Sequence, residues 1–333
     1  MNGPPQTRRR VLAGLGATAL ASRPSFAQSP LARAAEPHAG RLRAVVVARE
    51  GEVLEELVVS GPSAATPVNV KSVSKTVVAL LLGIAIGRGA VPGLEATLGA
   101  VAPRLVPRGA DPRVGAITLE DLVTMRAGLE RTSGANYGGW VASGDWVADA
   151  LSRPFVAEPG GRFLYSTGSF HVLGAALSEA TGQSLHALAR DWLAGPLGIV
   201  LPPWTRSPAG RFLGGNNMAL SPRALARIGQ VMLADGRWQG RQVVPAGWIA
   251  RAWTPRTVSP WSGDAYGYGW FLTEIGGERA AYARGYGGQM LHVLPGTGLT
   301  VAITSDPTRP ARSHGYVADL HRLVGDVAAR LRA

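Results

Sequence analysis

The sequence predicts an α+β fold, in which one antiparallel β-sheet is flanked by helices and a mainly helical domain is inserted into it. Three observations carry this prediction: strand patterns near the start of the chain, strand patterns again near its end, and helical patterns with Gly/Pro-rich loops between them. Strands at both ends bring the two termini to one sheet. We expect a single domain over residues 40–333, with the sheet from 40–60 and 265–333 and the helical region at about 76–255.

The first part of the sheet is predicted as a β-hairpin. Two valine-rich runs, Ala44 to Ala48 and Val53 to Val59, flank a short polar segment that contains Gly51. Extended apolar runs joined by a glycine-containing turn are typical of a hairpin.

The inserted region begins with the most apolar helix of the chain. Thr76 to Ile86 is an almost uninterrupted run of Leu, Val, Ala and Ile, which indicates a helix that is buried on most sides. Further helical patterns cover Leu119 to Met125, Phe170 to Ala180, and Arg223 to Leu233.

Strands return near the end of the chain. Met290 to Leu294 and Leu299 to Thr304 are joined by a Pro-Gly-Thr-Gly turn, which again predicts a hairpin. The last helix carries an apolar stripe at spacings of three and four, suited to packing on a sheet. The stripe consists of Val317, Leu320, Val324, Val327 and Leu331.

Composition excludes several kinds of site. The 333 residues are 46% hydrophobic and 17% charged, as in globular proteins, and include no cysteine. A disulfide scaffold, a thiolate-bound metal and a cysteine nucleophile are therefore excluded. The six histidines show no metal-binding spacing, so we expect no metal site. The mechanism predicted below requires no organic cofactor.

Residues 1–27 resemble a twin-arginine signal peptide. Arg8, Arg9 and Arg10 precede an eleven-residue apolar run, and Ala27 ends a small-residue cleavage pattern. The run is too short for a bilayer, which needs about 20 apolar residues. The alternative is a disordered arginine-rich N-terminus. We expect the twin-arginine export machinery to be a partner during secretion. The expected location is periplasmic or secreted, without a stable membrane span. Residues 28–39 are expected to form a linker.

The basic charge does not predict a nucleic-acid partner. Residues 1–27 contain four arginines and no acidic residue, so their removal lowers the net charge from +12 to +8. The remaining basic residues are scattered along the chain rather than clustered.

The strongest chemical signal is Ser72-Val73-Ser74-Lys75 at the start of the apolar helix. Residues three apart share a helix face, so the Ser72 hydroxyl and the Lys75 amine can form a hydrogen bond. Burial lowers the pKa of a lysine, and the neutral amine can then accept the serine proton. The backbone NH of Ser72, near a helix N-terminus, can face a developing oxyanion.

The use of lysine strengthens this interpretation. The chain has 34 basic residues, of which only Lys71 and Lys75 are lysines. An always-protonated guanidinium cannot act as a base, so an amine retained at position 75 has a chemical reason. For Lys71 two interpretations remain, a neighbouring charge that lowers the pKa of Lys75 or a solvated residue.

Two further segments contain candidate residues. Tyr165-Ser166-Thr167-Gly168 precedes an apolar helix, and a tyrosine beside a lysine can relay a proton, although a core tyrosine is the alternative. Ala283-Arg284-Gly285-Tyr286-Gly287-Gly288-Gln289 precedes a strand. Its glycines allow a substrate to approach the backbone, where an NH can complete an oxyanion hole; a Gly-rich hairpin entry is the alternative.

These three segments, in this order, resemble the serine β-lactamase and penicillin-recognising hydrolases. The similarity is to the class C branch with esterases, D-amino-acid peptidases and 6-aminohexanoate-dimer hydrolases, and covers roughly residues 40 to 330. It extends to stretches such as Ile117 to Leu122, Leu220 to Pro222, and Tyr266 to Trp270. The resemblance implies the β-lactamase / DD-peptidase-like fold, with the site in the cleft between sheet and helical domain.

The resemblance also implies roles for individual residues. Ser72 would be the acylated nucleophile, and Lys75 and Tyr165 the acid–base pair. The backbone NH groups of Ser72 and Tyr286 would bind the oxyanion. Candidate substrate-binding residues are Thr167, Gly285, Gly287, Gln289 and Tyr137.

Two positions depart from the family pattern. Thr167 stands where much of the family has Asn, and Ala283 where β-lactamases have Lys or His. Loss of that cation removes the expected partner of a β-lactam carboxylate. Arg284 follows, but on a strand we expect it to point the other way. The pattern is therefore more similar to the 6-aminohexanoate-dimer hydrolase and esterase members.

Several other residues have two interpretations. Gln289 either binds a substrate amide or braces its strand. Tyr137, Trp140 and Trp146 either line the cleft or pack in a loop-rich region. His171 is expected to be a packing histidine.

The sequence thus predicts a serine hydrolase that cleaves a small ester or amide through an acyl-enzyme on Ser72, with Lys75 and Tyr165 as general base and acid. The alternative enzyme is a D,D-peptidase or weak β-lactamase. An alternative of another class is a non-catalytic cell-envelope binding protein, which Ala283 favours and Lys75 does not.

Overall fold

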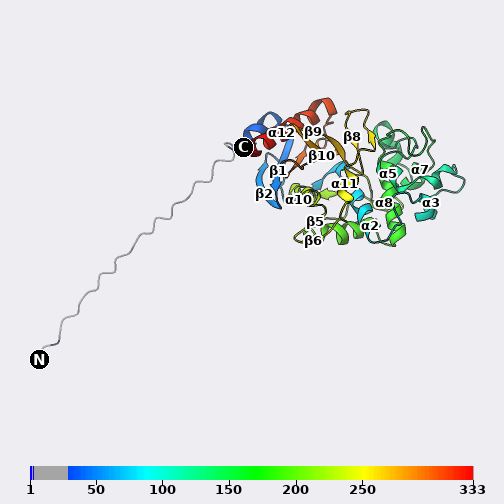
Figure 1. Cartoon of the computed structure of the whole chain (residues 1–333), viewed down its shortest axis with the longest axis horizontal. Coiled ribbons are helices and arrows are strands. Elements are labelled where there is room, and N and C mark those ends of the chain that lie inside the picture. Colours follow the sequence, from blue (N-terminus) through cyan, green and yellow to red (C-terminus); the bar gives the residue numbers. More distant parts are fainter. Residues whose placement is uncertain (2, 4–28, 333) are drawn as a thin grey trace.

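The computed structural model describes residues 1, 3 and 29–332, and the predicted signal peptide, apart from residues 1 and 3, lies outside them. The central element is an eight-stranded antiparallel sheet with strand order β2-β1-β12-β11-β10-β9-β8-β7 (Figure 1). Its strands are β1 (Leu42–Arg49), β2 (Glu52–Val58), β7 (Thr257–Val258), β8 (Ala265–Tyr266), β9 (Phe271–Ile275), β10 (Glu278–Gly285), β11 (Gln289–Leu294) and β12 (Leu299–Ser305).

The pairing of β1 with β12 joins the two ends of the chain, as predicted. Val45 pairs with Ile303 and Val47 with Val301, and all four side chains are fully buried. The predicted first hairpin is β1–β2, and its turn contains Gly51 at φ +87°, a conformation that glycine adopts without steric cost. The predicted α+β fold class is confirmed.

Helices cover both faces of the sheet. Helix α10 (Pro222–Leu233) packs against β1, β11 and β12. The C-terminal helix α12 (Ala318–Arg332) covers the opposite face, where the His321 ring lies 5.2 Å from that of His292 on β11. Although α10 belongs to the predicted helical region by sequence, its contacts are with the sheet.

The described part of the predicted linker, from residue 29 to 39, contains two short helical elements. It forms α1 (Pro30–Ala35) and the 3₁₀ turn η2 (Glu36–His38), and α1 contacts α12 and β2. Ser29 caps α1 by accepting a hydrogen bond from the Ala32 NH, and proline occupies the first helical position, where its missing NH has no cost. Leu31 is buried, which fixes the segment to the domain.

The inserted region consists mainly of short helices and loops. Its longest helices are α2 (Ser74–Gly87) and α8 (Thr167–Thr181), which contact each other. The shorter helical elements are η3 (Lys71–Val73), α3 (Leu98–Val101), η4 (Pro103–Leu105), α4 (Arg113–Ala116), α5 (Leu119–Val123), η5 (Gly134–Asn136), α6 (Tyr137–Val141), α7 (Trp146–Leu151), α9 (Leu185–Leu188), η6 (Ala189–Ala194) and α11 (Trp248–Ala252). Outside this region, η7 (Ser313–Val317) precedes α12. Two small two-stranded sheets pair β3 (Val68–Asn69) with β4 (Ala219–Leu220) and β5 (Arg237–Trp238) with β6 (Arg241–Gln242).

Helix α2 is the core of the inserted region. Its residues from Ser74 to Ala85 are all buried, as its continuous apolar run predicts. Gly83 allows close packing, because a Cβ there would lie 2.4 Å from the indole of Trp248. Helix α2 also contacts η3, and η3 in turn contacts β10, so the start of α2 lies next to the sheet.

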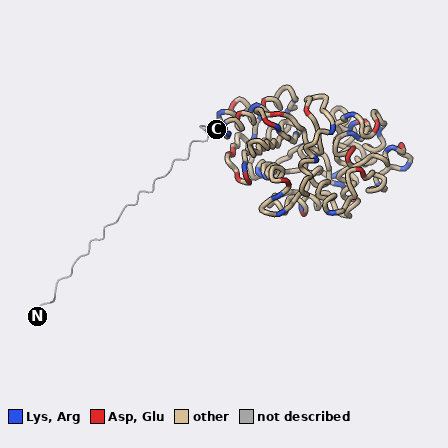
Figure 2. The backbone as a smooth tube through the Cα atoms, viewed as in Figure 1, with Lys and Arg blue, Asp and Glu red and all other residues tan. Residues whose placement is uncertain are grey.

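Charged residues are spread over the whole domain. Figure 2 shows Lys and Arg interspersed with Asp and Glu along the described chain. Within the described residues, no helix has both the length and the apolar character needed to cross a bilayer.

Candidate active site

Ser72 lies in the 3₁₀ turn η3 that leads directly into α2. The preceding residue, Lys71, has φ +52°, which is uncommon for a residue with a side chain. Local hydrogen bonds hold this turn: the Lys71 NH donates to Asn69 Oδ1 (2.9 Å), and the Ser74 hydroxyl donates to the Lys71 carbonyl (2.5 Å). Backbone strain supported in this way fixes the position of Ser72, which lines a pocket.

Lys75 is the buried partner of Ser72. Its side chain is 2% exposed, and its Nζ lies 2.9 Å from Ser72 Oγ. Two further oxygens surround Nζ: the Gly215 carbonyl at 2.5 Å and Thr167 Oγ1 at 3.3 Å. Desolvation by burial lowers the pKa of Lys75 from 10.5 to about 7.

The three oxygens can accept hydrogen bonds from the three N–H groups of an ammonium, and the same positions also accommodate the neutral amine. A neutral amine has two N–H donors and one lone pair, and a carbonyl oxygen can only accept. When the N–H groups donate to Gly215 and Thr167, the lone pair faces the hydroxyl of Ser72. The geometry therefore lets Lys75 accept the serine proton.

Tyr165 precedes α8 and lines the same pocket. Its ring centroid lies 5.0 Å from Lys75 Nζ. Burial raises the pKa of Tyr165, and a hydrogen bond to Ser72 and the charge of Arg284 oppose this effect. The phenol thus stays protonated near neutral pH and can donate a proton beside Ser72.

The residues after Tyr165 dock onto the loop at Thr132 and Ser133. Ser166 Oγ accepts a hydrogen bond from the Thr132 NH (3.1 Å), and the Gly168 NH donates to Thr132 Oγ1 (2.7 Å). Ser133 Oγ accepts from the Thr167 NH and also bonds Thr167 Oγ1, both at 2.9 Å. Thr167 is in this way held between Ser133 and Lys75.

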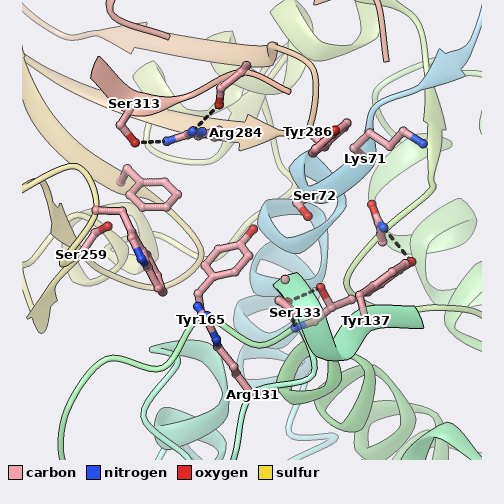
Figure 3. A pocket seen from close by; sticks show the side chains of 17 residues that line it. Lys71, Ser72, Arg131, Ser133, Tyr137, Tyr165, Ser259, Arg284, Tyr286 and Ser313 are labelled. Atoms are coloured by element: carbon pink, nitrogen blue, oxygen red, sulfur yellow. Dashed lines mark hydrogen bonds between the residues drawn. The ribbon is translucent and has the colours of Figure 1, made fainter. Parts of the chain in front are cut away.

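The end of β10 forms the other wall of the pocket. A Cβ on Gly285 would lie 2.4 Å from the Val70 carbonyl oxygen, so only glycine allows β10 to lie this close to η3. Tyr286 follows in the turn between β10 and β11 and is 53% exposed. Figure 3 shows Ser72 between Tyr286 and Tyr165 in the pocket.

The three sequence segments thus meet at one pocket of about 550 Å³. Its lining includes Ser72, Tyr165, Thr167, Gly285 and Tyr286. The described residues contain no group of three or more His, Cys, Asp or Glu side chains placed to hold a metal ion.

The family model described as Beta-lactamase matches residues 37–326. The chain belongs to the beta-lactamase family. The family model covers most of the chain, including all three segments of the pocket, and together with the Ser72–Lys75 pair it identifies the protein as a serine hydrolase. Among curated proteins, none matches this sequence.

Solved structures share the fold of this family member. A structure titled "Putative 6-aminohexanoate-dimer hydrolase from Bacillus anthracis" has a TM-score of 0.76 at 18% identity, covering 91% of this chain and 82% of that one. A penicillin-binding protein homologue from Caulobacter crescentus has a TM-score of 0.69 at 20% identity, covering 90% and 96%. EstCE1, a hydrolase with promiscuous acyltransferase activity, has a TM-score of 0.70 at 17% identity, covering 89% and 96%.

Arg284 lies in the pocket of this beta-lactamase-family protein, contrary to the sequence-based expectation. Ala283 pairs with Leu291 and is 1% exposed, whereas Arg284 pairs with Met290 and lines the pocket. Alternation along β10 does place the two side chains on opposite faces, as expected. The error lay in which of the two faces meets the pocket.

Two predicted substrate-binding residues lie outside the pocket lining. Gln289 is 1% exposed, and its amide donates to the Ser305 carbonyl (2.8 Å) and accepts from the Ser305 NH (3.2 Å). Of the two interpretations of Gln289, the structure shows the bracing one. At Gly287 a Cβ would lie 2.5 Å from the Asp306 carbonyl, so this glycine allows the turn after β10 to pack against the segment after β12.

The aromatic residues before Tyr165 divide between pocket and core. Tyr137 lines the pocket, and its hydroxyl accepts a hydrogen bond from Asn216 Nδ2 (3.0 Å). Trp140 and Trp146 are buried and pack on each other and on His171. His171 is buried, and its Nδ1 accepts from the Gly214 NH, so it packs as expected.

Sequence reasoning missed several residues of the pocket. The Gly215 carbonyl and the Ser133 hydroxyl act on Lys75 and Thr167, but a backbone carbonyl and an isolated serine carry no pattern. The sequence contains one signal for this contact, the pair Gly214-Gly215. A Cβ on Gly215 would lie 2.7 Å from the Thr167 carbonyl, so a glycine is needed where this segment packs against the start of α8. The remaining lining residues not predicted are Lys71, Arg131, Gly134, Asn216, Ser259, Trp261, Phe271, Arg284, Ala311 and Ser313.

Proposed function

We propose that this protein cleaves a small ester or amide through an acyl-enzyme on Ser72. The observation that carries the proposal is the hydrogen-bond arrangement of Lys75. Its buried amine has two acceptors for its N–H groups and Ser72 Oγ at 2.9 Å for its lone pair.

In the acylation step, Lys75 Nζ takes the proton of Ser72 as Oγ bonds to the substrate carbonyl carbon. The carbonyl π electrons move to oxygen, and the backbone NH groups of Ser72 and Tyr286 bind the resulting oxyanion. Collapse of the tetrahedral intermediate breaks the bond to the leaving group, which takes a proton from Tyr165 or Lys75.

In the deacylation step, water attacks the acyl carbon. The Lys75–Tyr165 pair removes one water proton and returns a proton to Ser72 Oγ, which restores the enzyme and releases the acid. Every proton moves between groups of the pocket, substrate and water. This scheme uses no metal or organic cofactor.

The nature of the substrate rests on the pocket. A volume of about 550 Å³ suits a small molecule. The buried Ala283 provides no cation, but the next residue, Arg284, lines the pocket, so the charge of the pocket does not by itself separate ester and amide hydrolysis from β-lactam hydrolysis. Residues 1–27 support export by the twin-arginine route, so we place the reaction in the periplasm or outside the cell.

The first experiment labels the exported protein with a fluorophosphonate probe and measures its intact mass. We expect one adduct in the wild type and in Ser259→Ala, a second serine of the pocket, and none in Ser72→Ala. Turnover of 4-nitrophenyl butyrate is expected to follow the same pattern. Absence of both adduct and turnover in the wild type would contradict the mechanism.

Lys75→Ala separates the hydrolase from a non-catalytic binding protein. A binding protein would keep its affinity for its ligand without Lys75, whereas a hydrolase would lose most of its rate. Cleavage of a D-alanyl-D-alanine peptide or of nitrocefin faster than of small esters would favour the D,D-peptidase or β-lactamase alternative.

A further inference from the structure

The charged groups of the pocket are all positive. Lys71, Arg131 and Arg284 line it, and none of the described residues of its lining is Asp or Glu. No described carboxylate lies within ion-pair distance of these three side chains. A partly buried cation without a carboxylate partner attracts an anion more strongly than one in open water.

Arg284 is the most precisely held of the three. Its Nη1 donates to Ser313 Oγ at 2.7 Å, and its Nη2 donates to the Ala311 carbonyl at 2.6 Å. Both partners are neutral, and a guanidinium has five N–H donors. The side chain is therefore fixed while keeping its charge and three donors for a further acceptor.

Arg131 and Lys71 are less suited to bind one group in one orientation. The Arg131 guanidinium lies over the ring of Trp261, 5.1 Å from its centroid. Lys71 has a flexible stem and a strongly hydrated ammonium. Figure 3 shows Arg131 and Arg284 on either side of Tyr165 in that view.

The position of Arg284 indicates which part of the substrate it meets. Arg284 and Tyr165 line the same pocket, and Figure 3 shows both on the side of Ser72 away from Lys71 and Tyr286. In the proposed reaction Tyr165 is one of the two groups that can protonate the leaving group, so a charge on the leaving group would come close to Arg284.

We propose that Arg284 binds a carboxylate carried by the leaving group of the substrate, so that the enzyme prefers anionic esters or amides of this kind. This inference rests on the proposed function. Arg284 stands on the strand face opposite Ala283, so the cation comes from a position where the family pattern does not predict one.

The test compares two esters that differ only in charge, 3-(butyryloxy)benzoate and 3-(butyryloxy)benzamide. We expect the wild type to have a kcat/KM at least tenfold higher for the benzoate. In Arg284→Gln this ratio is expected to fall by about tenfold to a hundredfold, the loss typical of a charge-assisted hydrogen bond. The ratio within each variant cancels effects on Tyr165 that both substrates share.

Arg131→Gln is the matched control, because it removes one positive charge from the same pocket. We expect it to change the ratio by less than threefold. An equal fall in Arg131→Gln and Arg284→Gln would overturn the assignment to Arg284. An unchanged ratio in Arg284→Gln, or no preference in the wild type, would also overturn it.

Two further measurements complete the test. Mono-4-nitrophenyl glutarate carries its charge on the acyl side, and a stronger dependence on Arg284 for this ester than for the benzoate would contradict the leaving-group assignment. Calorimetric binding of 3-hydroxybenzoate and 3-hydroxybenzamide to Ser72→Ala, with and without Arg284→Gln, needs no turnover. It detects the Arg284 site even if the proposed hydrolysis fails, and tighter benzoate binding that requires Arg284 is the expected result.

Discussion

Raising the pH from 6 to 8 should increase the rate of acylation, because Lys75 acts as a base only when neutral. With a pKa of about 7, its neutral fraction rises from about one-tenth to about nine-tenths over this interval. We therefore expect kcat/KM to rise about tenfold and then level off. A lysine with its ordinary pKa of 10.5 would be only about 0.3% neutral at pH 8, and the rate would continue to rise toward pH 10.

The assay is the pH dependence of kcat/KM for a neutral ester, followed by chromatography so that ionisation of the product does not affect detection. This parameter reports groups of the free enzyme. None of the described residues lining the pocket is a histidine, so an inflection near pH 7 is expected to belong to Lys75. Lys75→Arg is the control, because a guanidinium cannot accept the proton.

Two results would refute this reasoning. A profile that is flat from pH 6 to 8 and rises only above pH 9 would mean that burial does not lower the pKa of the catalytic group. An inflection near pH 7 that persists in Lys75→Arg, with most of the activity, would assign the base to another residue.

Three further predictions concern the residues that build the site. The lowered pKa of Lys75 reduces the free energy of unfolding by its full amount below about pH 7, and this cost is relieved as the pH rises toward 10.5. Lys75→Met removes the cost, so its gain in unfolding free energy, measured by urea denaturation, should be about 3 kcal/mol larger at pH 6 than at pH 9.5. Gly285→Ala should push β10 away from η3, which lowers kcat/KM and reduces the free energy of unfolding by about 1–3 kcal/mol; a fully active variant would contradict the close approach. Gly144→Ala is the control and should alter neither quantity, because no atom lies within 4 Å of its added Cβ. Ser133→Ala removes the hydrogen bonds to the Thr167 hydroxyl and NH, so we expect kcat/KM to fall about threefold to tenfold while the Ser72 adduct still forms. An unchanged kcat/KM would show that Thr167 does not need these hydrogen bonds.

Local patterns in the sequence were sufficient to predict the parts of the protein that depend on neighbours along the chain. The apolar run of α2, the hairpin of β1 and β2, and the Ser72–Lys75 pair all follow from spacings of two to four residues. The burial that lowers the pKa of Lys75 was also predictable, since its helix is apolar on every side.

The helical segment before β1 shows where pattern reasoning failed within short range. An Ala/Pro-rich composition predicts a linker. In the structure, Ser29 and the following proline begin a helix, and burial of Leu31 stabilises that helix against the domain. A six-residue helix is marginal by itself, so its contact with α12 and β2 decides the conformation.

The sequence by itself determined the chemical groups of the site and their order along the chain: a serine, a lysine three residues later, a tyrosine and a Gly-rich strand end. Only the tertiary structure decided what surrounds them. It brings the Gly215 carbonyl to Lys75, places Arg284 rather than Ala283 in the pocket, and uses Gln289 to hold β12. The physical reason is that side-chain alternation and helical periodicity define faces relative to one another, whereas packing between elements far apart in sequence decides which face meets the pocket.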